Sequence, residues 1–243
     1  MVDVRSGVVA GLTGLVTLLA GITLVAGLSP TSWAVGLACG LVLAGWVGRT
    51  VAGGLGPADL VTLGRAVLGC GVAALVVESS PRQTTLLLTA SVIALALDAV
   101  DGRVARATHR QTDFGARFDG EADAFLILVL SVHVAAAYGP WVLAIGAARY
   151  TFGLAGLFLP WLRERLPARQ WRKVVAAAQG ITLVVAAAEV VPVGLAQVAL
   201  ALALVLLAES FGRDVWWLHR RHGSGHAAAA RAAVTHGADR SST

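Results

Sequence analysis

The chain of 243 residues is 57% hydrophobic and only 14% charged, with a mean hydropathy of +0.75. Soluble proteins average roughly 45–50% apolar and about 25% charged residues, so this composition excludes a soluble enzyme with a membrane tag. The formal charge of +5 does not indicate a nucleic-acid partner, because aromatic residues are not interleaved with the arginines. Cys39 and Cys70 lie in apolar runs, where buried thiols are expected rather than a disulfide or a metal site.

Apolar runs follow one another along the chain and predict eight helices. A membrane span takes about 20 apolar residues. Several runs are shorter, so we expect their helices to continue through polar residues that line a protein cavity. The first run follows Arg5 but is too long for a signal peptide and lacks a small-residue cleavage site, so we interpret it as a retained span. The runs are Val8–Leu28, Trp33–Val47, Ala66–Val77, Thr84–Val100, Ala122–Tyr138, Trp141–Leu162, Val174–Val191 and Val193–Phe211.

Connections rich in arginine alternate with connections that carry almost no charge. Because positively charged loops stay on the cytoplasmic side, we predict that both termini are cytoplasmic and that the protein crosses a bacterial cell membrane several times. The tail, residues 222–243, is rich in Ala, Gly, Ser and His and is predicted to be mobile in the cytoplasm. The predicted cytoplasmic segments are Arg49–Arg65, Arg103–Arg117, Arg163–Lys173 and Arg213–Arg221.

Acidic residues are concentrated in one region, with six of the fourteen between Asp98 and Asp123. Asp98 and Asp101 are three residues apart at the end of one predicted helix. Asp119 and Asp123 are four residues apart at the start of the next. These spacings place each pair on one helix face. We therefore expect four carboxylates to meet near the cytoplasmic membrane boundary.

Carboxylates at this depth need a cation, a proton or a wet cavity. Neighbouring arginines offer one explanation, in which the carboxylates form ion pairs. The small residues Gly102, Ala105 and Gly115 favour another, because they let a bulky ligand approach the backbone. Divalent ions bound by carboxylates, together with Arg106, suit a diphosphate ligand. We favour metal-assisted phosphoryl chemistry over ion pairing alone.

Eight residues of this region form the pattern DxxDGxxARx8GxxxDxxxD with every spacing intact: Asp98, Asp101, Gly102, Ala105, Arg106, Gly115, Asp119 and Asp123. The pattern resembles the signature of the CDP-alcohol phosphotransferase (phosphatidyltransferase) family. Upstream, Pro57, Thr62 and Arg65 resemble the family's entry into its first core helix. The resemblance covers about Gly56–Phe211 and implies an all-α integral membrane fold, with a two-helix N-terminal hairpin before a six-helix core. We expect a hairpin at 1–50, a core at 56–213 and the tail at 222–243.

The resemblance also implies a reaction and roles for the site residues. A CDP-linked lipid, such as CDP-diacylglycerol, passes its phosphatidyl group to an alcohol and CMP leaves, as in phospholipid biosynthesis. Two divalent cations, Mg²⁺ or Mn²⁺, are the implied cofactors, and Asp123 is the implied general base. The implied metal ligands are Asp98, Asp101, Asp119 and Asp123. The implied nucleotide-binding residues are Thr62, Gly102, Ala105, Arg106 and Gly115. Family members commonly form homodimers, so a homodimer is expected.

Three cations bear on the identity of the acceptor. Arg149 lies within a span, where a buried charge tends to mark a substrate path, but an ion pair with Glu121 or Glu189 explains it equally well. Arg172 and Lys173 suit an acceptor phosphate, although contact with anionic lipid is the more favoured interpretation. Together they favour a phosphorylated acceptor, such as glycerol 3-phosphate or inositol phosphate, over serine or another non-phosphorylated alcohol. A cation-coupled transporter is the alternative from another class, but the sequence has neither the inverted repeats nor the discontinuous helices that would support it.

Overall fold

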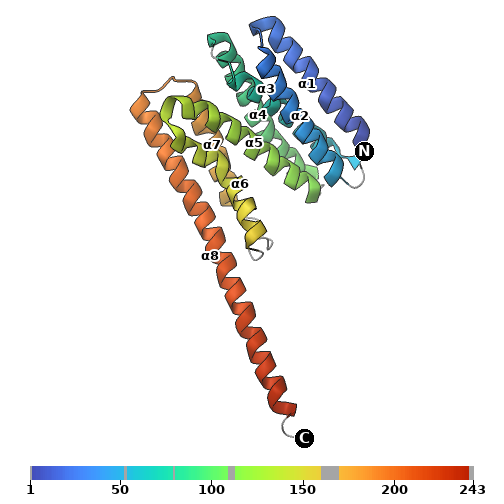
Figure 1. The fold of residues 1–243 in the computed structure, drawn as a ribbon, viewed down its shortest axis with the longest axis vertical. Helices are drawn as coiled ribbons and strands as arrows, with labels where there is room; N and C mark the ends of the chain where they lie inside the picture. Colours follow the sequence, from blue (N-terminus) through green and yellow to red (C-terminus); the bar gives the residue numbers. More distant parts are fainter. Residues whose placement is uncertain (1, 52–53, 79, 109–112, 160–169, 241–243) are drawn as a thin grey trace.

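The computed structural model describes the backbone of residues 2–51, 54–78, 80–108, 113–159 and 170–240, and their side chains apart from those at 99–108, 113, 170, 173 and 221–240. Eight α-helices occupy most of this part of the chain and confirm the predicted all-α membrane fold (Figure 1). The hairpin is formed by α1 (Val4–Ala26) and α2 (Pro30–Thr50). The six core helices are α3 (Pro57–Val76), α4 (Pro81–Thr108), α5 (Asp113–Tyr138), α6 (Leu143–Phe158), α7 (Gln170–Ala187) and α8 (Val193–Arg240).

Six of the described helices are long and apolar enough to cross a membrane, as expected of a multi-pass membrane protein. These stretches are Val4–Ala26, Pro30–Thr50, Pro57–Val76, Phe114–Tyr138, Pro140–Phe158 and Val193–Arg220. The apolar part of α7, Val174–Ala187, is shorter. Helix α7 begins four residues before this apolar part, at Gln170, and so includes charged residues. This agrees with the expectation that helices with short apolar runs continue through polar residues.

Several helices begin or end well outside their apolar runs. Helix α3 starts at Pro57 rather than Ala66, and α5 starts at Asp113 rather than Ala122. The polar first turns of α3 belong to the helix because they are buried against neighbours: Asp59, Thr62 and Arg65 are each at most 6% exposed. Tertiary contacts, which hydropathy alone does not record, therefore set these ends. The acidic residues consequently lie inside helices instead of at their ends.

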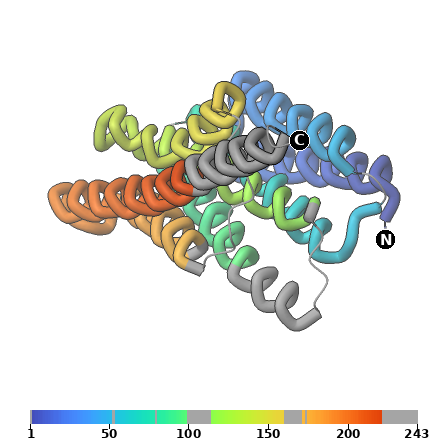
Figure 2. Tube along the Cα trace, turned by 90° about the horizontal axis from the view of Figure 1, so that it is seen from below, coloured from blue at the N-terminus to red at the C-terminus, as the bar shows by residue number. Residues whose placement is uncertain are grey.

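Helix α8 continues without a break from Val193 to Arg240 and projects away from the bundle (Figure 1). It thus includes most of the segment 222–243, for which the sequence predicts a mobile tail. The division of the chain into hairpin, core and tail remains a prediction. Seen along the bundle, the hairpin lies on one side and α7 and α8 lie on the opposite side (Figure 2).

A short antiparallel pair of strands, β1 (Val2–Asp3) and β2 (Gly54–Leu55), adds to the helices. These strands were not predicted, because two-residue segments carry no alternating pattern of apolar and polar residues. The pair joins the start of α1 to the connection between α2 and α3, and Leu55 is buried against Gly7 of α1. It therefore fastens the hairpin to the entrance of the first core helix.

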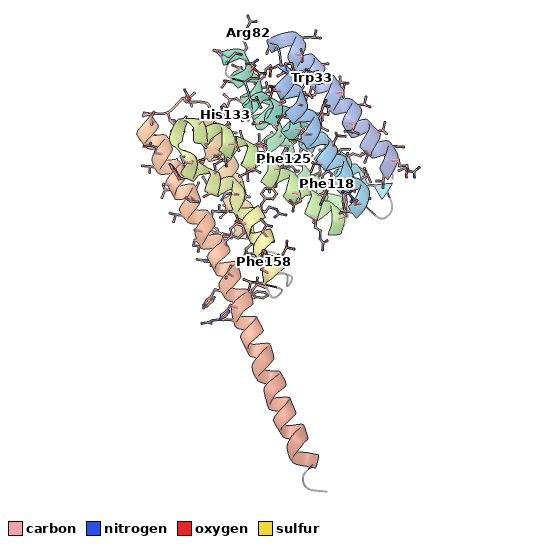
Figure 3. All side chains as sticks on the ribbon, viewed as in Figure 1. Trp33, Arg82, Phe118, Phe125, His133 and Phe158 are labelled. Carbon is pink, nitrogen blue, oxygen red and sulfur yellow. The ribbon has the colours of Figure 1, made fainter. Side chains whose placement is uncertain are left out.

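The hairpin packs on the core through apolar and aromatic side chains. Leu15 and Leu19 of α1 are buried with Cys70 and Ala74 of α3. Near the other end of α2, the ring of Trp46 stacks on that of Phe114 of α5 and lies tilted against that of Phe118, with ring centroids 5.9 and 5.8 Å from it. Buried aromatic clusters of this kind bury large apolar areas. Figure 3 shows Phe118 and Phe125 of α5 beside the hairpin, on the face turned toward α2 and α3.

Hydrogen bonds tie together the connections at the end of the bundle marked by Arg82 and Trp33 in Figure 3. The carboxylate of Glu78, after α3, accepts bonds from the backbone N–H of Ser29 at 2.7 Å and from the hydroxyl of Ser32 at 2.6 Å. These donors at the start of α2 stabilise the charged form and lower the pKa of Glu78. Gln83 of α4 donates from Nε2 to the backbone oxygen of Gly27 at 2.7 Å. The hairpin and the core are thus joined by polar bonds at this end.

Candidate functional site

Three aspartates gather around one arginine where α3, α4 and α5 pack together. Nη1 of Arg65 lies 3.0 Å from Oδ1 of Asp98 and 2.5 Å from Oδ1 of Asp119. Its Nη2 bonds to Oδ1 of Asp123. Arg65 is 4% exposed, whereas the three aspartate side chains are between 28% and 39% exposed. A buried cation from α3 therefore holds carboxylates from two other helices, and the carboxylates keep one side open.

Helix geometry explains how the sequence brings these groups together. Asp119 and Asp123 lie one turn apart on the same face of α5. Asp98 lies on the preceding helix, α4. Helix α3 packs against both, so Arg65 reaches all three carboxylates from a single position. The prediction that residues of both acidic pairs come together is supported for Asp98, Asp119 and Asp123.

The cluster fits a divalent metal ion. Oxygens of Asp98, Asp119 and Asp123 all lie within 4.8 Å of one another, and carboxylate oxygens are the ligands that Mg²⁺ and Mn²⁺ prefer. Three carboxylates around one guanidinium leave a formal charge of −2 on this group of four side chains. A divalent cation would balance that charge, and it would share these oxygens with Arg65 or displace the guanidinium from them.

The structure places the remaining predicted residues of the motif only in part. Gly115 lies one turn before Asp119 on α5. Thr62 lies one turn before Arg65 on α3, is 5% exposed, and donates from Oγ1 to the backbone oxygen of Ala58 at 3.2 Å. Asp101, Gly102, Ala105 and Arg106 belong to α4 by their backbone, but their side-chain surroundings lie outside the described residues. Their predicted roles therefore remain predictions.

A cavity of about 260 Å³ lies beside the aspartate cluster, walled by four core helices. Each helix contributes one stripe of residues at helical spacing. The lining includes Gly120, Asp123, Ala124 and Ile127 of α5; Ile145, Gly146, Arg149 and Phe152 of α6; Arg172, Val175, Ala176 and Gln179 of α7; and Leu207, Ser210, Phe211 and Asp214 of α8. Of the three clustered aspartates, Asp123 lines this cavity. It therefore belongs to both the cluster and the cavity.

Two cations in the cavity wall have carboxylate partners. Nη2 of Arg149 lies 2.7 Å from Oε1 of Glu121. Of the two predicted partners of Arg149, Glu121 and Glu189, it is therefore Glu121 that forms the ion pair. Nη1 of Arg172 lies 3.6 Å from Oδ2 of Asp214, which is 6% exposed. Both arginines line the cavity as well, so ion pairing and a role in ligand binding are compatible. Lys173 follows Arg172 on α7, but its side chain lies outside the described residues.

A model of the CDP-alcohol phosphatidyltransferase family matches residues 56–208, which is more than half of the chain. The chain belongs to the CDP-alcohol phosphatidyltransferase family. The match begins just before α3 and ends within α8, so it covers the six-helix core and leaves the hairpin outside. This agrees with the extent of the resemblance predicted from the motif, about Gly56–Phe211. No curated protein and no solved structure gives a significant match to the chain.

Sequence reasoning missed two features of the site. Arg65 was recognised as part of the helix entry, but its place at the centre of the aspartates was not predicted. A signal was present, because Arg65 directly precedes the apolar run Ala66–Val77 and follows Leu60, Val61 and Leu63, so a helix continued through it would need a counter-charge for the arginine. Gln179 was also missed. One amide in an apolar helix gives no sign of its surroundings until the neighbouring helices are placed.

Proposed function

We propose that this protein transfers a phosphatidyl group from a CDP-linked lipid, such as CDP-diacylglycerol, to an alcohol, with release of CMP. One observation carries the proposal: Asp123 belongs to a carboxylate cluster suited to metal ions and also lines a cavity large enough for a small alcohol. Membership of the family supplies the reaction class. The cluster and the cavity supply separate places for the donor's diphosphate and for the acceptor.

We assign the aspartates as ligands of two divalent cations, Mg²⁺ or Mn²⁺, with Asp98, Asp119 and Asp123 joined by Asp101. When bound, these ions would neutralise the charge of the donor's diphosphate and favour the departure of CMP. Thr62, Gly102, Ala105, Arg106 and Gly115 are the residues that we assign to nucleotide binding. Their support is the family motif together with the position of Thr62 and Gly115, each one turn from a residue of the cluster.

Asp123 is assigned as the general base because its carboxylate faces the cavity. It takes the proton of the acceptor hydroxyl. The hydroxyl oxygen then forms a bond to the phosphorus attached to the lipid, the bond from that phosphorus to CMP breaks, and CMP leaves with the bonding electrons. Arg65 holds Asp123 in place by its Nη2 bond. Positioned general bases of this kind contribute about 10²–10⁴ to the rate.

The acceptor is assigned to the cavity between α5, α6, α7 and α8, and we propose that it is phosphorylated, as glycerol 3-phosphate and inositol phosphate are. Arg149 and Arg172 support this assignment, since both line the cavity, and Lys173 follows in sequence. An arginine recognises phosphate through several N–H donors at once. We place the site on the cytoplasmic side of the membrane, because Arg65, Asp98, Asp119 and Asp123 lie toward the ends of α3, α4 and α5 that the arginine-rich connections join. We also expect a homodimer.

Activity of the purified protein tests the proposal. The protein in detergent is supplied with CDP-diacylglycerol, Mn²⁺ or Mg²⁺ and a panel of alcohols, and CMP release and lipid products are measured. We expect metal-dependent CMP release that one class of acceptor stimulates. Absence of CMP release with every acceptor, despite binding of the metal and the donor, would contradict the proposal.

Asp123→Asn tests the role of the base. The amide keeps the shape of the side chain but cannot accept the proton, so we expect transfer to fall at least 100-fold, while CDP-diacylglycerol still raises the thermal stability of the variant. Glu189→Gln is the matched control, because it also removes one carboxylate, and Glu189 lies beyond α7, away from the cluster. Turnover close to that of the unmodified protein in Asp123→Asn would remove Asp123 from its assigned role.

A further inference from the structure

Gln179 of α7 is a buried amide in the wall of the cavity. The residue is 4% exposed and lines the cavity beside Asp123. Among the described residues, its Nε2 has no hydrogen-bond partner. Buried polar groups are nearly always paired, because an unpaired group loses its bonds to water without replacement. A molecule bound in the cavity that Gln179 lines would supply the missing hydrogen-bond partner.

A second buried glutamine shows what a structural role looks like in the same protein. Gln83 is 7% exposed, and its Nε2 donates to the backbone oxygens of Gly27 and Ala26 at 2.7 and 3.3 Å. Its Oε1 accepts from the backbone N–H of Ser80 at 3.0 Å. Gln83 is thus held by the turn that it stabilises. Gln179 lines the cavity, but among the described residues its Nε2 has no hydrogen-bond partner of this kind.

Gln179 lies at the opposite end of the cavity from the charged side chains, which indicates where a ligand would need an uncharged oxygen. It lies two turns, about 10 Å, along α7 from Arg172. Helices α5 to α8 run in alternating directions, so Gln179 lies at the same end of the cavity as Ile127, Ile145 and Leu207. Arg172 lies at the other end, beside Asp214. The charged groups are thus gathered at one end of the cavity. At the opposite, largely apolar end, the amide nitrogen of Gln179 is a donor that has no partner in the part of the chain that the structure describes.

We infer that Gln179 is a specificity-determining residue of the acceptor site, whose Nε2 donates a hydrogen bond to an oxygen of a polyol acceptor other than the hydroxyl that reacts. The inference rests on the proposed function, which places the reacting hydroxyl at Asp123. A polyol carries a further oxygen beyond the one that reacts at Asp123, and this oxygen is the partner that we assign to Gln179. An amino alcohol with one hydroxyl leaves the amide unpaired. Sites built to bond a substrate hydroxyl discriminate strongly against analogues that lack it.

Acceptor analogues test the inference directly. Unmodified protein and Gln179→Met are compared with glycerol 3-phosphate and its 2-deoxy analogue, propane-1,3-diol monophosphate, and with myo-inositol phosphate and its mono-deoxy analogues. For the unmodified protein we expect removal of the recognised hydroxyl to lower kcat/KM about tenfold or more. For Gln179→Met we expect parent and analogue to react with equal kcat/KM, because the donor is absent. The KM for CDP-diacylglycerol should not change.

Stability supplies a second readout that separates ligand binding from a structural role. Methionine is close to glutamine in size and removes an unpaired buried group, so Gln179→Met should unfold at the same temperature as the unmodified protein or a higher one. Gln83→Met is the matched control. It should lower the unfolding temperature, because it breaks bonds to the turn at Gly27, and leave acceptor discrimination unchanged.

Each outcome counts for or against the inference. Equal discrimination by the unmodified protein and Gln179→Met would overturn it, as would an unmodified protein indifferent to every deoxy analogue. A Gln179→Met variant that fails to fold would also overturn it, since Gln179 would then have structural partners. If the unmodified protein transfers to no alcohol, the proposed function fails and the inference fails with it. Transfer that proceeds normally without a role for Gln179 leaves the proposed function intact.

Discussion

Replacement of Arg65 by methionine tests whether one buried cation holds the aspartate cluster together. Methionine fills much of the same space but leaves Asp98, Asp119 and Asp123 without their shared partner. Removing one member of a buried ion pair costs about 3–5 kcal/mol. The carboxylates are up to 39% exposed, so water screens part of their repulsion, and we expect the lower end, about 3 kcal/mol. The measurement is the free energy of unfolding of the detergent-solubilised protein in EDTA.

Metal ions should reverse much of this loss. An ion that binds only the folded state adds about 2.7 kcal/mol at 100 times its dissociation constant. In Arg65→Met the ion does not compete with a guanidinium for the same oxygens, so Mn²⁺ should stabilise the variant more than the unmodified protein. Arg213→Met is the control. The side chain of Arg213 is 63% exposed and pairs with the half-buried Glu209 one turn away on α8, and an ion pair with so exposed a member contributes about 0.5 kcal/mol or less. Equal stability of Arg65→Met and the unmodified protein in EDTA, with equal gains from Mn²⁺, would refute the reasoning.

Three further predictions concern the cavity wall and the opposite end of the bundle. Arg149→Ala should raise the acceptor KM about tenfold and the donor KM much less; equal changes in both would indicate that the pair with Glu121 is purely structural. Gly146→Ala should destabilise the fold by about 1–3 kcal/mol in urea unfolding, because the added Cβ would lie 2.6 Å from the backbone of Leu128; a neutral effect would mean that α5 and α6 separate easily. The lowered pKa of Glu78 means that its contribution to stability is present above its unfolded pKa of about 4.3 and is lost as the pH falls through the lower folded value. Glu78→Gln should therefore lose less stability than the unmodified protein between pH 5 and pH 3, roughly the range over which such a carboxylate becomes protonated, and identical pH profiles would count against this role.

Hydropathy predicted the eight α-helices of the described residues correctly, because a helix that is buried or faces the membrane must be apolar over most of its length whatever it packs against. It placed several helix ends wrongly for a related reason. The polar residues Asp59, Thr62 and Arg65 fall outside the apolar run, yet they lie in α3 because other helices bury them. The pair of short strands that joins Val2–Asp3 to Gly54–Leu55 gave no pattern at all. Local composition reports which segments are helical, and only the neighbours of a segment decide where it stops.

The family and the three described aspartates of the cluster were readable from the sequence alone, since a helix turns through a fixed angle per residue and the spacing of the motif therefore sets which side chains share a face. The tertiary structure decided what surrounds them. Arg65 reaches Asp98, Asp119 and Asp123 only because α3 packs between α4 and α5, and the cavity exists only because four helices each turn one stripe inward. Gln179 is the clearest example. Its burial and its unpaired nitrogen depend on residues far away in the chain, and no spacing within one helix records which donors those distant residues leave unsatisfied.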